Sequence, residues 1–168
     1  MERISAIELA MKNEEREMAF YLNEAKHAIN PLAKYMFETL AADEKDHINL
    51  LRKLHAKLTA DGTWPKEVPM NVAGNNVKAT VENVVKRHGS KVAHADSDTD
   101  ALRKGIQFEA EAVRFYGEVA DACADPAEEN FFRYLAKIEH QHMSAIEDAL
   151  LYLEDPSAWK TCHEAVDQ

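Results

Sequence analysis

Two fragments of this sequence place a glutamate three residues before a histidine, EKDH at residues 44–47 and EHQH at residues 139–142. Residues three apart lie on one face of a helix, so each fragment can direct a carboxylate and an imidazole at the same point. Two more glutamates, Glu14 and Glu109, stand among apolar residues. Carboxylates and imidazoles without thiolates suit iron or manganese, and zinc can also occupy such a set.

An internal duplication keeps these residues in register. A shift of 95 positions superposes two halves of the sequence and pairs the six residues as follows: Glu14 with Glu109, Glu44 with Glu139, and His47 with His142. The same shift superposes Asn30-Pro31 on Asp125-Pro126, which are start signals for helices. The chain is therefore organised as a duplicated helical hairpin, and the repeat retains the polar groups that interrupt its apolar stripes.

Four long helices are needed to position these side chains. Apolar residues recur at steps of three and four, which predicts helices over about 3–28, 31–60, 98–123 and 126–154, joined by a crossover over 61–97. Ser97 or Asp98 can cap the third helix. A helix of nearly 30 residues is about 43 Å long, so the crossover can span the bundle and leave the second and third helices parallel. One weak helical pattern within it runs from Thr80 to His88.

The six repeated residues are predicted to meet inside the bundle. In each hairpin the first glutamate lies about 16 residues before the turn and the second about 13 after it, so antiparallel neighbours bring them to one level. Four buried carboxylates at one level repel one another and lose their hydration. Two divalent cations would neutralise them, and one imidazole could bind each metal. Glu-x-x-His motifs on two helices, with a glutamate on each of the other two, are the ligand set of di-iron and di-manganese bundles.

The sequence resembles the rubrerythrin-like branch of the ferritin-like di-iron proteins. Besides the two Glu-x-x-His motifs, it has two copies of a glutamate followed six and seven residues later by Phe-Tyr: Glu14 with Phe20-Tyr21, and Glu109 with Phe115-Tyr116. The resemblance covers roughly residues 3–155. It implies an all-α, ferritin-like four-helix bundle of two repeated hairpins with a long crossover, holding two metal ions, which we expect to be iron, with manganese or zinc as alternatives.

The resemblance also implies a role for each side chain. Glu44 and Glu139 would bridge the two metals. Glu14 and His47 would complete the ligands of one metal, and Glu109 and His142 those of the other. We expect Tyr21 and Tyr116, two turns after Glu14 and Glu109, to donate hydrogen bonds to the ligands. Each tyrosine could equally be a core aromatic whose hydroxyl is satisfied elsewhere.

Three features depart from full-length rubrerythrin. The two cysteines of this sequence cannot form the four-cysteine rubredoxin site that supplies electrons there, so turnover would need a separate electron-donor protein. Ala112 stands where rubrerythrin has an extra glutamate one turn after the third-helix ligand, a change that bears on peroxidase chemistry. Glu17 occupies the matching place on the first helix, and could be a seventh ligand or a solvated surface residue.

These observations predict a di-iron oxidoreductase in which two Fe(II) ions reduce H2O2 or O2 with two electrons. Two alternatives stay open, a ferroxidase of an iron-storage shell and a non-redox metal-binding bundle that holds Zn or Mn. An aerobic hydroxylase would need an organic substrate pocket that the sequence does not identify. The family resemblance also implies a homodimer.

Composition restricts the remaining partners. A length of 168 residues fits one domain, and 5 Gly and 5 Pro favour helices over sheets. A net charge of −10 argues against nucleic acid, because no basic face is present. The N-terminus carries acidic residues, unlike a signal peptide, and no stretch approaches the roughly 20 apolar residues of a membrane span. We therefore expect a cytoplasmic protein with no membrane partner.

Overall fold

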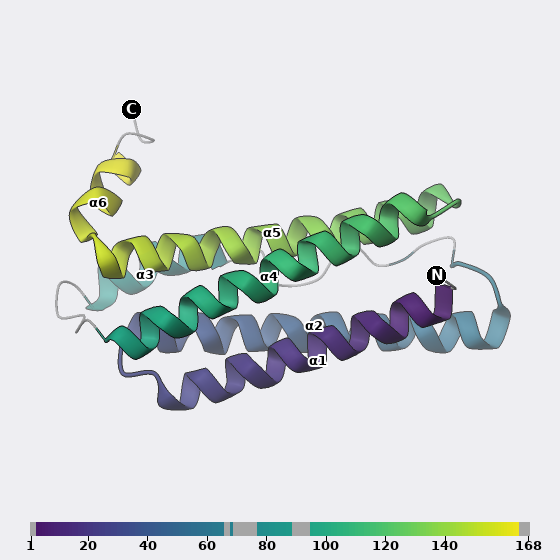
Figure 1. Ribbon diagram of the computed structural model, residues 1–168, viewed down its shortest axis with the longest axis horizontal. Helices are drawn as coiled ribbons and strands as arrows, with labels where there is room; N and C mark the ends of the chain where they lie inside the picture. Colours follow the sequence, from purple (N-terminus) through teal and green to yellow (C-terminus); the bar gives the residue numbers. More distant parts are fainter. Residues whose placement is uncertain (1–2, 66–67, 69–76, 89–94, 165–168) are drawn as a thin grey trace.

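The computed structural model of the chain describes residues 3–65, 68, 77–88 and 95–164, and these residues form helices and no strand. The helices are α1 (Arg3–His27), α2 (Pro31–Asp61), α3 (Val77–His88), α4 (Asp96–Ala122), α5 (Pro126–Glu154) and α6 (Pro156–Glu164). Helices α1 and α2 form the first antiparallel hairpin, and α4 and α5 form the second (Figure 1). Helices α2 and α4 run in the same direction, so the predicted all-α bundle of two hairpins with a crossover is confirmed.

The two hairpin turns are built in the same way. The side chain of Asn30 accepts a hydrogen bond from the backbone N–H of Leu32 at 2.8 Å, and that of Asp125 accepts one from Ala127 at 2.9 Å. In both turns a proline opens the next helix, where its missing N–H costs nothing. These shared caps fix where α2 and α5 begin and therefore the register of their ligand residues.

The crossover contains more structure than its sequence pattern indicated. Helix α3 covers the predicted segment and packs against α2 and α5, with Val81 and Val84 buried in the core. Helix α4 begins at Asp96, two residues earlier than predicted, and its cap position is Ala95, so neither Ser97 nor Asp98 caps it through a side chain.

The buried Asp98 carboxylate faces the first hairpin instead of capping its own helix. Its Oδ2 accepts hydrogen bonds from the backbone N–H groups of Ile29, at 3.0 Å, and Asn30, at 2.6 Å. The start of α4 is thereby attached to the turn between α1 and α2. A tertiary contact of this kind has no signature in local sequence, which explains why the capping prediction was wrong.

Helix α6 was not predicted, although Asp155-Pro156 repeats the start signal of the other two turns. The Asp155 side chain accepts a hydrogen bond from the backbone N–H of Ala158 at 2.9 Å. Trp159 packs its ring edge-on to Tyr152, with 5.1 Å between centroids, and its indole donates to Asp148 at 2.9 Å. The helix thus covers one end of the bundle with a buried aromatic side chain.

The apolar core is divided into two clusters. One cluster includes Tyr21, Phe37 and Ile146, and the other includes Ile7, Leu51, Tyr116 and Phe132. Each of the four long helices passes from one cluster to the other, and each carries a repeated glutamate between them. The polar residues therefore form a layer at the middle of the bundle.

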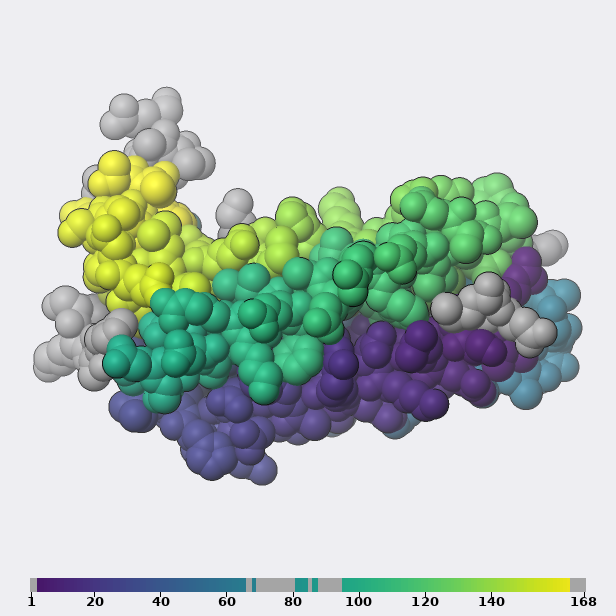
Figure 2. Space-filling model, in the orientation of Figure 1, coloured from purple at the N-terminus to yellow at the C-terminus, as the bar shows by residue number. Residues whose placement is uncertain are grey.

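Side chains of α1 and α4 meet over one face of this layer (Figure 2).

Within the described residues, no helix is both long enough and apolar enough to cross a membrane.

Candidate metal centre

The structure brings all six repeated residues together in the polar layer. Each is at most 1% exposed: Glu14, Glu44, His47, Glu109, Glu139 and His142. They come from all four long helices, one glutamate each from α1 and α4 and a glutamate with a histidine each from α2 and α5. The two imidazole rings stack at the centre, with centroids 5.5 Å apart and planes 16° apart.

Two carboxylates lie between the two imidazoles. Glu44 places Oε2 3.0 Å from Nδ1 of His47 and Oε1 3.4 Å from Nδ1 of His142. Glu139 places Oε1 3.4 Å from Nδ1 of His47 and Oε2 3.1 Å from Nδ1 of His142. Each of these carboxylates therefore offers one oxygen to each half of the cluster, as a bridging ligand would.

The other two carboxylates each face one imidazole. Oε2 of Glu14 lies 2.9 Å from Nδ1 of His47, and Oε2 of Glu109 lies 3.6 Å from Nδ1 of His142. The cluster thus consists of two overlapping groups of four residues, and in each group one ligand atom per residue lies within 4.8 Å of all the others. A cation bonded at about 2.1 Å holds its ligand atoms at most about 4.2 Å apart, so small adjustments would close either group around one ion.

Two tyrosines hold the remaining oxygens of these terminal glutamates. Tyr21 of α1 donates a hydrogen bond to Oε1 of Glu109, and Tyr116 of α4 donates one to Oε1 of Glu14. Each tyrosine therefore reaches the glutamate of the other hairpin. Gly105 makes room for the first contact, because a methyl group there would lie 3.3 Å from a ring carbon of Tyr21.

The donor set fits two cations. Three carboxylate oxygens of the cluster are buried without a hydrogen-bond partner: Glu44 Oε1, Glu109 Oε2 and Glu139 Oε1. In the described part of the chain, no lysine or arginine forms an ion pair with any of the four glutamates. Buried carboxylates without counterions are strongly destabilising, and two divalent ions would balance four of them.

Without metal, the cluster retains protons. Burial raises the pKa of Glu109 to about 8, and burial together with neighbouring carboxylates raises that of Glu14. Burial works against charged imidazoles, but the surrounding carboxylates outweigh it and raise the pKa of His47 and His142. Burial also opposes ionisation of Glu44, yet its two histidine neighbours lower its pKa. Cations would therefore displace protons from several of these groups when they bind.

Glu17 lies beside the cluster rather than at the surface. It is 1% exposed, its Oε2 has no hydrogen-bond partner, and Arg16 approaches its other oxygen only at 3.9 Å. Burial, followed by the charges of Glu44 and Glu14, raises its pKa. The alternative of a solvated surface residue is therefore wrong, whereas ligation of a metal by Glu17 stays a prediction.

Asp43 is a neighbour of the cluster that sequence reasoning missed. It is buried directly before Glu44, and its Oδ2 lies 3.3 Å from Nε2 of His142. The repeat contained a signal for it, because position 138, which matches position 43, carries Ile138. An acid in the first repeat at a position that is apolar in the second indicates that Asp43 has a role that Ile138 cannot have.

The bundle and its carboxylate and histidine cluster define the class, a ferritin-like protein with a site suited to a pair of metal ions. The chain belongs to the rubrerythrin family, because the Rubrerythrin family model matches residues 5–150. A search of curated proteins and a search of solved structures found no match.

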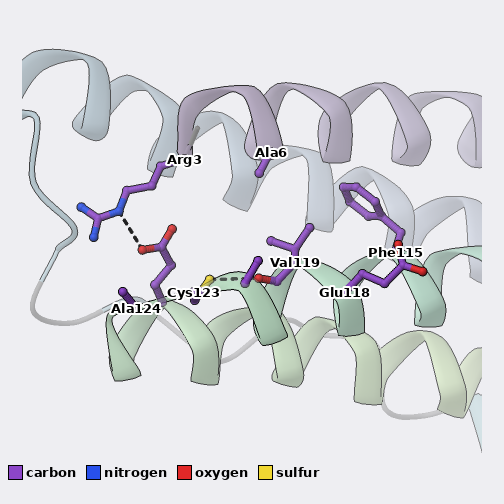
Figure 3. Close-up of a pocket in the computed structure, with 9 residues that line it drawn as sticks. Arg3, Ala6, Phe115, Glu118, Val119, Cys123 and Ala124 are labelled. Carbon is purple, nitrogen blue, oxygen red and sulfur yellow. Dashed lines mark hydrogen bonds and ion pairs between the residues drawn. The ribbon is translucent and has the colours of Figure 1, made fainter. Parts of the chain in front are cut away.

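A surface pocket of about 380 Å³ lies apart from the cluster, where α1 begins and α4 ends (Figure 3). Its lining includes Arg3, Phe115, Val119 and Cys123 and none of the six cluster residues. Arg3 forms an ion pair of 2.7 Å there with the buried Glu128. Two charged groups of this pocket therefore neutralise each other, and the pocket lining contains no residue of the cluster.

Proposed function

We propose that this protein is a di-iron oxidoreductase that reduces hydrogen peroxide or dioxygen with electrons from a separate donor protein. The observation that carries the proposal is the pair of overlapping ligand groups, which share Glu44 and Glu139 and whose glutamates form no ion pair with a lysine or arginine among the described residues. Membership of the rubrerythrin family supports iron as the metal.

Iron in both positions would supply one electron from each ion, so that an oxidant receives two electrons together. The protein residues contribute position and charge. Glu44 and Glu139 would fix the separation of the two ions, because each offers an oxygen to both sides. The apolar clusters on both sides of the layer exclude bulk water, which strengthens electrostatic interactions at the centre.

The tyrosines would keep the terminal ligands in place. Burial, followed by the charge of the adjacent glutamate, raises the pKa of the Tyr21 and Tyr116 hydroxyls. Both hydroxyls therefore keep their protons at neutral pH and remain donors to Glu109 and Glu14. A fixed hydrogen bond to one carboxylate oxygen leaves the other oxygen oriented towards the metal position.

The electrons for repeated turnover would come from outside this chain. Cys123 follows α4 and Cys162 lies in α6, and Figure 1 places α6 and the turn after α4 at opposite ends of the bundle. Burial raises the pKa of the Cys123 thiol to about 11, so it has little thiolate for redox chemistry. The family resemblance implies a homodimer, which we include in the proposal.

Rapid mixing tests the proposal. Metal-free protein is loaded with two equivalents of Fe(II) under anaerobic conditions and mixed with H2O2 or O2 while absorption of oxidised iron is followed. We expect a fast absorption change in the wild type and its loss in Glu44→Ala. No change in the wild type, or the same change in Glu44→Ala, would contradict the proposal.

The same preparations separate the alternatives. A storage protein would form a shell of many subunits and oxidise far more than two iron ions per chain. A non-redox bundle would be isolated with Zn or Mn and would leave peroxide unchanged. Solution mass and metal content, measured on protein purified without added metal, distinguish both from the proposed oxidoreductase and show whether the protein is a dimer.

A further inference from the structure

The two histidines of the cluster differ at their outer nitrogens. Nε2 of His142 lies 3.3 Å from Oδ2 of Asp43, an ion-pair distance, and neither atom has a hydrogen bond to a described residue. Nε2 of His47 is buried without a partner. The repeat explains the difference, because the position that matches Asp43 carries Ile138, which is 2% exposed and has no polar atom in its side chain.

We infer that Asp43 is a positioning residue that strengthens metal binding at the position of Glu109 and His142, and that the position of Glu14 and His47 has no counterpart. The inference rests on the proposed function only in that it requires a centre for two metals. It does not depend on iron or on a reaction with an oxidant.

The chemistry of a neutral imidazole supports this role. Such a ring carries one proton, so a histidine that binds a cation through Nδ1 must hold its proton on Nε2. Nδ1 of His142 is the atom that faces the cluster, 3.1 Å from Glu139 and 3.6 Å from Glu109. Its Nε2–H therefore lies on the side of Asp43, whose Oδ2 is 3.3 Å from Nε2. A carboxylate in this place fixes the tautomer and the ring orientation and makes the metal-binding nitrogen more basic.

The position of Asp43 in the fold also suits the role. It lies on α2 of the first hairpin and contacts a histidine on α5 of the second hairpin. It stands directly before Glu44 in the chain, so the α2 backbone that places a bridging ligand also places this carboxylate. Removal of such outer partners typically weakens metal binding by about 10–100-fold.

Equilibrium titration tests the inference on the full chain without any redox step. Metal-free protein is titrated with Zn(II) or Co(II) against a chromophoric chelator, and two dissociation constants are fitted. In Asp43→Ala we expect one constant to rise about 10–100-fold and the other to stay within about twofold. Asp43→Asn, which keeps a hydrogen-bond acceptor but loses the charge, should lie between Ala and wild type.

Three results would overturn the inference. Unchanged constants would show that Asp43 only fills space, and equal weakening of both steps would show a general structural effect. Tighter binding in Asp43→Ala would show that Asp43 mainly stabilises a protonated histidine that competes with metal.

A double-mutant cycle identifies the histidine through which Asp43 acts. In a His47→Ala background, Asp43→Ala should still weaken binding of the remaining metal by about 10–100-fold. In a His142→Ala background, Asp43→Ala should have no further effect. An effect of Asp43→Ala in the His142→Ala background, with none in the His47→Ala background, would show that Asp43 acts through His47 and would contradict the inference.

A reciprocal variant supplies an independent arm. Ile138→Asp places a carboxylate at the matching position of the second hairpin, where it can face Nε2 of His47, and Ile138→Val controls for the loss of volume. We expect Ile138→Asp, but not Ile138→Val, to lower the dissociation constant that Asp43→Ala leaves unchanged. If Ile138→Asp fails to fold, the Asp43 variants and the cycle still decide the question.

The outcomes distinguish this inference from the proposed function. The protein could bind two Zn(II) ions with the expected effect of Asp43→Ala, while its iron-loaded form does not react with H2O2 or O2. That result would support the inference and contradict the proposed oxidoreductase function. Oxidation of iron with an unaffected Asp43→Ala titration would do the opposite.

Discussion

The two hairpins share their metal-ligand residues but differ in the acids around them. Both carry a terminal glutamate, a bridging glutamate and a histidine in the same register. Among the described residues, the first hairpin adds two buried acids beside the cluster, Glu17 and Asp43, whose counterparts in the second are Ala112 and Ile138. The shared residues form one cluster to which both halves contribute, so neither half can lose its ligands without affecting the other. Residues outside the shared set could diverge, and they make the surroundings of the two ligand groups unequal.

The two extra acids of the first hairpin lie beside the cluster in different places. Glu17 lies one turn after Glu14 and is buried near the charges of Glu44 and Glu14, whereas Asp43 contacts His142 across the bundle. The second hairpin has apolar side chains in both matching places. The asymmetry of the sequence therefore predicts different surroundings for the two metals, rather than one complete and one defective position.

Removing a bridging ligand should have the largest effect, because Glu44 and Glu139 each belong to both ligand groups. We expect Glu44→Gln and Glu139→Gln each to lower metal content from two ions per chain to less than one, since each carboxylate belongs to both ligand groups. Glu14→Gln, which removes a terminal ligand, should keep about one ion. Elemental analysis of metal-reconstituted protein measures all three. Equal losses in Glu14→Gln and the bridging variants would show that the ligand groups do not overlap as described.

The pH dependence of stability should separate the metal-free from the loaded protein. In the metal-free fold the pKa of Glu109 rises from 4.5 to about 8, so the folded state keeps a proton that the unfolded state loses, and stability falls as pH rises from about 5 to 8. The raised pKa of His47 and His142 acts in the same direction, because their stabilisation is present below pH 6.5 and is lost above it. Metal binding is instead favoured as protons leave.

Thermal unfolding with and without Zn(II) tests this expectation between pH 5.5 and 8. The difference in melting temperature between loaded and metal-free protein should widen steadily with pH. A constant difference would mean that the cluster does not hold protons in the metal-free state.

Glu17 should lower the stability of the metal-free fold, unlike its neutral counterpart Ala112. We expect Glu17→Gln to stabilise the metal-free fold by about 1–3 kcal/mol, because it removes a buried acid whose ionisation is opposed by neighbouring carboxylates. Glu15→Gln, at an exposed position, should change little. Urea unfolding measures both variants. Destabilisation by Glu17→Gln would show that the carboxylate has a stabilising partner in the metal-free state.

The smallest effect concerns the helix glycines of the second hairpin. Alanine at Gly117, where nothing lies within 4 Å of an added methyl, should stabilise α4 by about 1 kcal/mol. At Gly105 the methyl would press on the Tyr21 ring at 3.3 Å and cancel this gain. Urea unfolding of both variants gives the difference. An equal gain at Gly105 would show that Tyr21 can move away without cost.

The long helices and the six cluster residues could be predicted because both produce regular patterns in the sequence. Helical periodicity and proline-based caps define α1, α2 and α5, and the duplication singles out polar residues on apolar stripes. Sequence reasoning did not find helix α6, whose nine residues are too short for a periodic pattern. Nor did it find that Tyr21 and Tyr116 reach across to the other hairpin, since that depends on how the hairpins pack.

Asp43 shows why the surroundings of a site are harder to predict than its ligands. Its partner, His142, lies on another helix, and nothing in the residues near position 43 specifies that contact. Only comparison with Ile138 in the repeat could have raised the question. Ligands are constrained by the metals they share, whereas a supporting residue is constrained by one contact that the fold alone creates.

The central claim is that the six residues enclose two cations, and crystals of iron-loaded protein test it most directly. Diffraction data collected at the iron absorption edge should show two anomalous peaks, both between Glu44 and Glu139, one beside Glu14 and His47 and the other beside Glu109 and His142. No peak in the polar layer, with a lysine or arginine side chain turned into it instead, would contradict the account.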